Sequence, residues 1–293
     1  MIWQLYSNYI IKNKIAIMKL KLLSFCLLFI TVFFSCKKED LSTGLDSGNK
    51  PNGSIQVLSK VMIDNQSAFE YIYNDSSQLT SEKSKFNFSL NHYNALGQLK
   101  STDYYGNDDV LSCDAQVAQA ALSSNVWVCS TTGAKGGTLS YSYNDKGQLI
   151  KTLYSRPVTT NSEYSEFTYN ANGKISRQTM YWADAATGYI DYSYDSKGNL
   201  VKEMLYNLPS SGVAELITTT QYEFDSKLNP YLSGKILIPG VNTNPNNIVK
   251  ETYTIRISPD QGSDKVLVTP TAYTYNNSGY PVSKNGNTTF IYN

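Results

Sequence analysis

Aromatic and polar residues alternate in short runs along the chain, and each run ends in a polar turn. Tyr141–Leu149 reads YSYNDKGQL, and Tyr192–Leu200 reads YSYDSKGNL. Such alternation places both rings on one face of a β-strand and the serine on the other. The four residues after the second tyrosine fit a type I turn in which glycine takes the left-handed conformation, and the leucine begins a return strand. Each unit therefore predicts one β-hairpin.

The same unit recurs through most of the chain. Its order is aromatic, any residue, aromatic, Asn or Asp, two variable positions, Gly, a polar residue, and Leu or Ile. Further copies begin at Tyr71 and Phe167, with a shortened copy at Tyr93 and decayed copies at Tyr222 and Tyr273. The expected turn glycines are Gly97, Gly147, Gly173, Gly198 and Gly279. Because a lone hairpin is only marginally stable in water, neighbouring hairpins must pair and share a buried face. The pattern predicts an all-β fold, an antiparallel meander that forms one long twisted sheet, open or partly rolled.

A basic and apolar leader precedes the repeats. Lys19 and Lys21 are followed by the apolar run 22–34 and then by Ser35 and Cys36. The run would rise about 20 Å as a helix, less than the roughly 30 Å of a bilayer core, so we expect a cleaved signal and not a membrane-spanning helix.

The stretch TVFFSCKKED around this cysteine resembles a bacterial lipoprotein signal, in the relaxed form found in Bacteroidetes. The resemblance implies a signal peptide at 1–35, with Met18 as the true start, and lipidation of Cys36. It also implies anchoring in the outer membrane, with exposure at the cell surface as one arrangement.

Charge and cysteine content fit an exported protein. Four lysines and no acidic residue precede Cys36, so a chain that begins there carries 21 basic and 24 acidic residues. Without a basic block, nucleic acid is a poor candidate for a partner. In an oxidising compartment, Cys113 and Cys129 are expected to form a disulfide, the alternative being two buried thiols.

Three regions follow from these patterns. Residues 1–35 are the expected signal peptide, and residues 36–54, rich in Gly, Ser, Asn and charge, are a flexible tether. Residues 55–293 form the repeat domain, in which a cysteine-bearing insertion lies around 105–138.

The repeated unit resembles the YD repeat of Rhs-type proteins, Tyr-x-Tyr-Asp-x-x-Gly-Arg-Leu. In this chain Gln, Lys or Asn stands in place of the Arg, and Asn often replaces the Asp. Long Rhs proteins wind dozens of units into a shell around a toxin, and this chain has too few units to do so. The leader and the divergent repeats together are similar to Bacteroidetes surface lipoproteins of unknown function, in which such units build an open or partly rolled sheet.

The residues offer little catalytic chemistry. His92 is the one histidine, no Gly-x-Ser-x-Gly elbow is present, and zinc clusters need more His or Cys residues than the chain has. We therefore expect no metal and no cofactor. Glu163, Glu166, Asp184 and Asp191 lie near aromatic-rich strands and are the carboxylates considered for glycoside hydrolysis. Their spacing does not single out an acid and a base, and exposed charges beside strands are the ordinary alternative.

The high content of aromatic residues is the one feature of the composition that indicates a function. The candidates for ligand contact are Trp127, Trp182 and Tyr181, because amphipathic rings suit binding surfaces. The competing interpretation assigns most tyrosines to the shared buried face of the repeats.

Three functions remain open on the sequence alone. The first is a non-catalytic binding or scaffold module, held to the membrane by its N-terminal lipid, with a glycan or another envelope protein as ligand. The second is an envelope glycosidase that uses carboxylates. The third is a structural partner that pairs through its sheet edge with an outer-membrane protein. We expect no enzymatic activity, because repeats spread residues evenly whereas catalysis concentrates unlike groups in one place.

Overall fold

A computed structural model describes residues 56–84, 88–105, 135–157, 161–233, 237–257 and 262–293. Several features expected from the sequence lie outside these residues: the signal peptide, the tether, Cys36, Cys113, Cys129 and Trp127. The described residues contain no helix that is long and apolar enough to cross a membrane.

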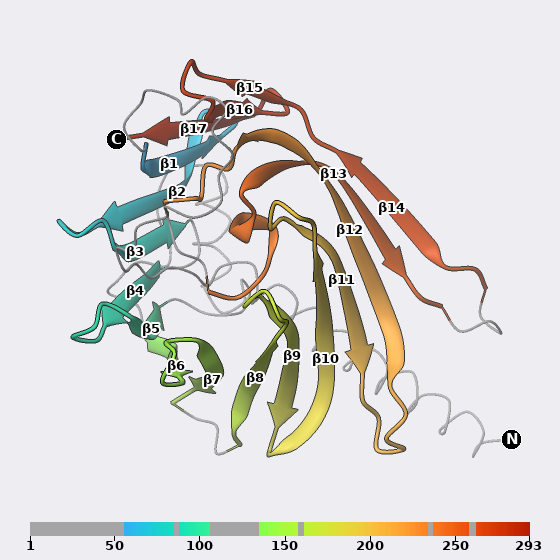
Figure 1. Cartoon of the computed structure of the whole chain (residues 1–293). Coiled ribbons are helices and arrows are strands. Elements are labelled where there is room, and N and C mark those ends of the chain that lie inside the picture. The colour runs from blue at the N-terminus through green and yellow to red at the C-terminus, as the bar shows by residue number, and fades with distance from the viewer. Residues whose placement is uncertain (1–55, 85–87, 106–134, 158–160, 234–236, 258–261) are drawn as a thin grey trace, which may run out of the picture. The chain divides into compact units, whose positions relative to one another are not determined.

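The described residues form one antiparallel sheet of seventeen strands, so the predicted all-β open meander is confirmed (Figure 1). The strands are β1 (Leu58–Ile63), β2 (Gln66–Tyr73), β3 (Leu79–Ser84), β4 (Phe88–Tyr93), β5 (Leu99–Tyr105), β6 (Lys135–Tyr143), β7 (Leu149–Ser155), β8 (Glu163–Tyr169), β9 (Ile175–Trp182), β10 (Ala185–Tyr194), β11 (Leu200–Asn207), β12 (Glu215–Leu228), β13 (Asn246–Ile255), β14 (Lys265–Pro270), β15 (Tyr273–Tyr275), β16 (Pro281–Lys284) and β17 (Thr288–Tyr292). A 3₁₀ turn, η2 (Val241–Thr243), precedes β13.

Strand order follows chain order except at the ends of the chain. Each strand from β1 to β14 pairs with the next, and β5 pairs with β6 across residues 106–134. The last strand, β17, pairs with the first, β1, with Tyr292 opposite Leu58. Figure 1 shows red β17 beside blue β1. Among the described strands, β14 pairs only with β13 and β15 only with β16, so these two form the edges of the sheet.

The turns explain the Asn and Gly of the repeated unit. The side-chain oxygen of Asn144 accepts hydrogen bonds from the backbone N–H groups of Lys146 at 3.0 Å and Gln148 at 2.9 Å. Gly147 donates its N–H to the Asn144 carbonyl at 2.9 Å and has a φ of 75°, which a side chain would strain. The equivalent residues make the same side-chain contacts in the other turns: Asn74, Asn94, Asn170, Asp195 and Asn276. The other turn glycines, Gly97, Gly173, Gly198 and Gly279, have φ between 73° and 86°.

The second aromatic residue of five units links successive hairpins. Its hydroxyl donates to the backbone carbonyl of the Leu, Ile or Pro that begins the return strand of the preceding unit. The pairs are Tyr93 to Leu79 at 2.7 Å, Tyr143 to Leu99 at 2.7 Å, Tyr169 to Leu149 at 2.8 Å, Tyr194 to Ile175 at 2.9 Å and Tyr292 to Pro281 at 2.6 Å. This contact requires tyrosine at the position, since phenylalanine has no hydroxyl.

This hydroxyl contact gives a direct prediction for Tyr194. Tyr194→Phe is expected to lower the free energy of unfolding by about 1 kcal/mol, because the Ile175 carbonyl loses its donor while the ring still packs. Urea denaturation measures the change. Tyr164→Phe is the matched control, since Tyr164 keeps its stacked ring on the other side of the sheet, and its unfolding should change little. Equal effects of the two substitutions would contradict the assigned role.

The core lies on one face, here called the buried face. It holds the repeat leucines Leu79, Leu99, Leu149 and Leu200, which are 0–3% exposed, and the first aromatic residue of most units. The hydroxyls of these aromatic residues meet polar side chains of the preceding return strand: Tyr141 with Thr102 at 3.3 Å, Tyr192 with Gln178 at 2.9 Å and Tyr222 with Glu203 at 3.0 Å. These three buried hydroxyls therefore have partners, as burial requires.

The repeat is interrupted at β12, and the segment between β12 and β13 makes a different contact with β11. Phe224 replaces the second tyrosine and has no hydroxyl to donate. Asn244 from this segment instead accepts a hydrogen bond from the Leu200 backbone N–H at 2.6 Å. Tyr231, from the same segment, packs edge-on against Tyr71 of β2 with the ring centroids 6.3 Å apart. The segment thus bonds to β11 and contacts β2, which is far from it in sheet order.

Candidate ligand-binding face

The side of the sheet opposite the buried face carries paired aromatic rings and is called the ladder face. Tyr164 of β8 lies directly opposite Tyr181 of β9, and the rings stack with centroids 4.5 Å apart and planes 10° apart. The ammonium of Lys151 lies 3.5 Å from the centroid of the Tyr164 ring. A cation and two stacked rings therefore follow one another across three strands, an arrangement that both stacking and cation–π attraction favour.

The next repeat builds the same arrangement two strands further on. Tyr189 of β10 lies opposite Tyr206 of β11, with centroids 4.6 Å apart and planes 19° apart. Arg177 lies 3.9 Å from the centroid of Tyr189. Phe88 and Tyr105, also directly opposite each other, form a third pair at 6.0 Å.

These pairs occupy fixed places in the repeated unit. The first ring stands five residues before the second aromatic position, and its partner stands six residues after the repeat Leu or Ile. Of the six rings, only Tyr181 was expected from the sequence. The two fixed spacings are present in the sequence and could have identified the other five.

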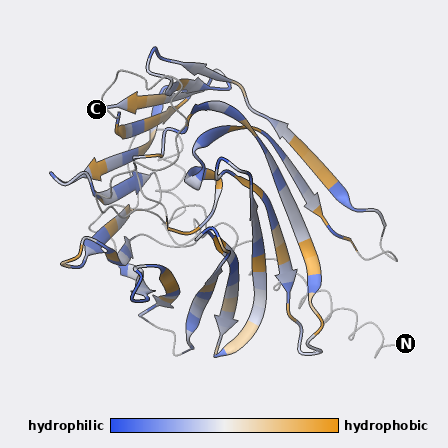
Figure 2. Cartoon of the chain, in the orientation of Figure 1, coloured by the Kyte–Doolittle hydropathy of each residue, from blue (hydrophilic) through white to orange (hydrophobic). Residues whose placement is uncertain are grey.

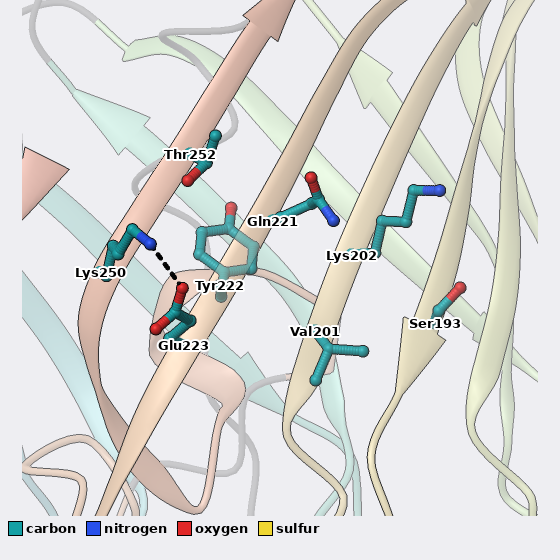
Figure 3. Close-up of a pocket in the computed structure, with 8 residues that line it drawn as sticks. All are labelled: Ser193, Val201, Lys202, Gln221, Tyr222, Glu223, Lys250 and Thr252. Atoms are coloured by element: carbon teal, nitrogen blue, oxygen red, sulfur yellow. Dashed lines mark hydrogen bonds and ion pairs between the residues drawn. The ribbon is translucent and has the colours of Figure 1, made fainter. Parts of the chain in front are cut away.

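Near these ring pairs, a polar groove of about 490 Å³ opens across β10, β11, β12 and β13 (Figure 3). Ser193, Lys202, Gln221, Glu223, Lys250 and Thr252 contribute its polar side chains, and Val201 and Tyr222 complete the lining. Ser193 and Lys202 share the ladder face with Tyr189 and Tyr206, because residues two or four apart in a strand point to the same side. Tyr222 alternates with Gln221 and Glu223, so its ring points to the buried face.

The register of the sheet places four of these side chains in one row. Ser193 lies opposite Lys202, Lys202 opposite Gln221, and Gln221 opposite Thr252. With strands spaced about 4.8 Å apart, the row covers roughly 14 Å across the strands. At one side of the row, Lys250 donates to Glu223 at 2.7 Å, so these two charges neutralise each other.

The groups in the row are available to a ligand. Among the described residues, Lys202 has no ion-pair partner, and the side chains of Ser193, Gln221 and Thr252 make no hydrogen bond to protein. The row therefore offers hydroxyl and amide groups that can both donate and accept hydrogen bonds, and an ammonium group that donates them. Sequence reasoning missed all four residues, because only the register of four strands brings them together.

The aromatic residues proposed from the sequence do not form one site. Tyr181 stacks in the ladder, whereas Trp182, its neighbour in β9, points to the opposite side of the strand and is 43% exposed. Trp127 lies outside the described residues.

The four carboxylates considered for glycoside hydrolysis are engaged in local contacts. Asp191 accepts two hydrogen bonds from Arg177, at 2.6 and 2.8 Å, and Asp184 accepts one from Ser162 at 2.9 Å. Glu166 lies 3.8 Å from the Lys151 ammonium, and Glu163 lies 3.9 Å from the Arg156 guanidinium.

Three other carboxyls, on the buried face, have raised pKa values. Burial raises the pKa of Glu203 to about 7, although the hydroxyl of Tyr222 favours its ionised form. Burial also raises the pKa of Glu251, which lies opposite Tyr222, and raises the pKa of Glu82 to about 8. Raised pKa values of this kind are found in catalytic acids and in structural sites alike. The Tyr222 hydroxyl, which hydrogen-bonds Glu203, lies on the buried face, and Glu203 is not among the residues that line the groove.

Metal-binding clusters are not found within the described part of the chain. His92 lies 3.1 Å from Asp103, which also contacts the Lys135 ammonium at 2.6 Å. This arrangement is an ion-pair network between neighbouring strands.

No model of a known protein family matches the sequence, and no curated protein matches it either. Solved structures that resemble the fold include a porin-like protein from Bacteroides uniformis, at 14% identity over 80% of this chain and 98% of that chain, with a TM-score of 0.38. A porin-like protein from Bacteroides vulgatus matches at 10% identity over 81% of this chain and 99% of that one, with a TM-score of 0.34. TcdB2-TccC3 matches 76% of this chain at 14% identity with a TM-score of 0.28, and the match spans only 10% of that protein. Likenesses at these scores carry no argument about activity.

Proposed function

We propose that this protein is a lipid-anchored, non-catalytic binding module of the bacterial outer membrane, which holds a polysaccharide in the groove on its ladder face. The observation that carries the proposal is the row Ser193, Lys202, Gln221 and Thr252, whose polar groups have no protein partner among the described residues. Side chains of this kind in a groove are the usual means of fixing a polar ligand.

The chemistry of the row favours a sugar polymer over an apolar ligand. The groove contains six polar or charged side chains, and Val201 is its one aliphatic residue. A chain of sugars that lies across the strands would meet one polar side chain per strand. Hydroxyl and amide groups match sugar hydroxyls in both donor and acceptor capacity.

The contacts of the proposed catalytic carboxylates favour binding over hydrolysis. Asp191 is held in a bidentate contact by Arg177, and Asp184 by Ser162. A retaining or inverting glycosidase needs two carboxyls that face one scissile bond. Within the groove, Glu223 is the one carboxylate, and Lys250 neutralises it.

The anchor and the tether rest on the sequence. Cys36 follows an apolar run of secretory length, and the polar residues 37–54 suit a flexible stalk between the lipid and the YD-like sheet. Cys36→Ser is expected to move the protein from the membrane fraction to the soluble fraction of lysed cells. Retention of the variant in membranes would contradict lipid anchoring.

The binding proposal is tested with the full-length protein in detergent micelles. Titration calorimetry with amylopectin, β-mannan and polygalacturonate should detect binding of at least one polymer. Gln221→Leu should weaken that binding at least tenfold, because it removes a donor and an acceptor from the centre of the row. Unchanged affinity in Gln221→Leu, or no binding of any polymer, would overturn the proposal.

The matched control is Gln66→Leu. Gln66 is an exposed residue at the start of β2, away from the groove. This variant loses the same side chain and should bind the polymer as the wild type does.

A further inference from the structure

β14 is an edge strand with an unusual composition. Its six residues read KVLVTP and all are exposed, with Val266 60%, Leu267 62% and Val268 49% accessible. Figure 2 shows hydrophobic residues, in orange, along this strand. Exposed apolar edge strands are templates for pairing with another strand.

The hydrogen-bond phase of β14 identifies which backbone groups are available. Thr271 donates its N–H to the Val249 carbonyl at 2.8 Å. The backbone N–H and C=O groups of the odd-numbered residues in this stretch therefore point toward β13. The N–H and C=O groups of Val266 and Val268 therefore point away from β13. Pro270, which has no N–H, also falls on the outward phase, where a proline does not interrupt the ladder with β13.

We infer that β14 pairs antiparallel with β14 of a second copy of this chain, with Leu267 opposite Leu267 of the other copy. In this register Val266 lies opposite Val268 of the partner copy, and both residues have outward N–H and C=O groups. This Val266–Val268 pair occurs twice, once on each side of the two-fold axis. In each pair the two residues exchange two backbone hydrogen bonds, as a hydrogen-bonded antiparallel pair does. The exposed edge of β14 is then covered by β14 of the second copy.

The sequence of the strand favours a second copy over an unrelated partner. Val266-Leu267-Val268 reads the same in both directions, so a two-fold axis through Leu267 matches each side chain with one of its own kind. The same register places Lys265 opposite Thr269, and so keeps the two lysines apart. Asp264, next to the strand, already pairs with Arg256 of its own chain.

The pairing has a consequence for the groove. Val268 lies opposite Thr252, so the ladder face of β14 adjoins the groove. Because the two-fold axis of an antiparallel pair is perpendicular to the sheet, both grooves open on the same side. The two β13 strands are three strand spacings apart, about 14 Å. A polymer long enough to reach both grooves gains affinity from the second contact.

Cysteine cross-linking in membranes of cells that make the full-length protein tests the register. In the proposed register the two Leu267 residues form a non-hydrogen-bonded pair. The Cα atoms of such a pair lie about 4.5 Å apart, which a disulfide can bridge. Leu267→Cys should therefore give a disulfide-linked dimer after mild oxidation with copper phenanthroline. Val268→Cys is the matched control, since its two copies would lie roughly 9 Å apart, beyond the reach of a disulfide.

The parent protein, with its native cysteines, controls for background linkage. Linkage of Leu267→Cys well above that of both controls supports the pairing. Linkage at Val268→Cys equal to that at Leu267→Cys would overturn the register, and absence of linkage at both would overturn the pairing.

Sedimentation of the full-length protein in detergent micelles gives a second, independent measurement. The wild type should sediment as a dimer, and Val268→Lys should raise the dissociation constant of the dimer at least tenfold by placing a charge in the interface. Val213→Lys changes an exposed valine in the loop before β12, away from β14, and should remain dimeric. A wild type that stays monomeric at every concentration would refute the inference.

Discussion

Leu200→Ala is expected to lower the free energy of unfolding by about 2–5 kcal/mol, among the largest effects of any single substitution in this sheet. The Leu200 side chain is 0% exposed. Removing it leaves a cavity in the core on the buried face of β11. The repeat leucine should therefore be the position at which each hairpin is least tolerant of truncation.

Urea denaturation measures the effect, with Leu153→Ala as the matched control. Leu153 is 38% exposed on the ladder side of β7, so the same truncation should cost less than about 1 kcal/mol. Similar losses in the two variants would mean that the repeat leucines do not form the packed core.

Stability is expected to fall as the pH rises from about 5 to about 8, because two buried carboxyls must lose their protons. Burial raises the pKa of Glu203 from 4.5 to about 7 and that of Glu82 from 4.5 to about 8. In the unfolded chain both groups ionise near 4.5, so the folded state binds more protons between these values. The stability that these two carboxyls contribute is therefore fully present below the unfolded pKa and decreases as the pH passes through the folded pKa.

The size of the effect follows from the shifts. Each unit of pKa corresponds to about 1.4 kcal/mol, so the limits are about 3 kcal/mol for Glu203 and about 5 kcal/mol for Glu82. The carboxyls are buried, but both residues keep part of their surface exposed, and solvent screening reduces these limits. Even half of this sum is a large fraction of the stability of a typical domain.

Glutamine substitution isolates the contribution of each carboxyl. Glu82→Gln and Glu203→Gln should each flatten the fall in unfolding free energy measured at pH 5, 6.5 and 8, and each should be more stable than the wild type at pH 8. The glutamine at 203 still offers an oxygen to the Tyr222 hydroxyl. Glu215→Gln, at an exposed position, is the control and should keep the wild-type slope. A wild type whose stability rises over this range would contradict the buried assignment.

The hairpins could be predicted because their determinants are local. Asn144 and Gly147 form the turn through contacts within five residues, and the alternation of Tyr141 and Tyr143 defines the strand face. These features depend on short-range geometry that a sequence pattern records directly.

The remaining features depend on contacts between distant residues. Pairing of the C-terminal β17 with β1 brings Tyr292 opposite Leu58, and nothing in either stretch indicates the other. The groove likewise requires the register of four strands. The register shifts at Ser193/Tyr194, Leu205/Tyr206 and Glu223/Phe224, so counting along the sequence does not align Lys202 with Gln221.

The acceptor for each linking tyrosine hydroxyl is a main-chain oxygen, and Pro281 provides it as well as Leu99 does. Loss or duplication of an entire hairpin therefore leaves a usable acceptor at the new junction, whatever residue stands there. Genes for such sheets can change length by recombination between copies without a compensating point mutation. The number of hairpins is then a quantity that selection can adjust separately from the residues that line any one surface.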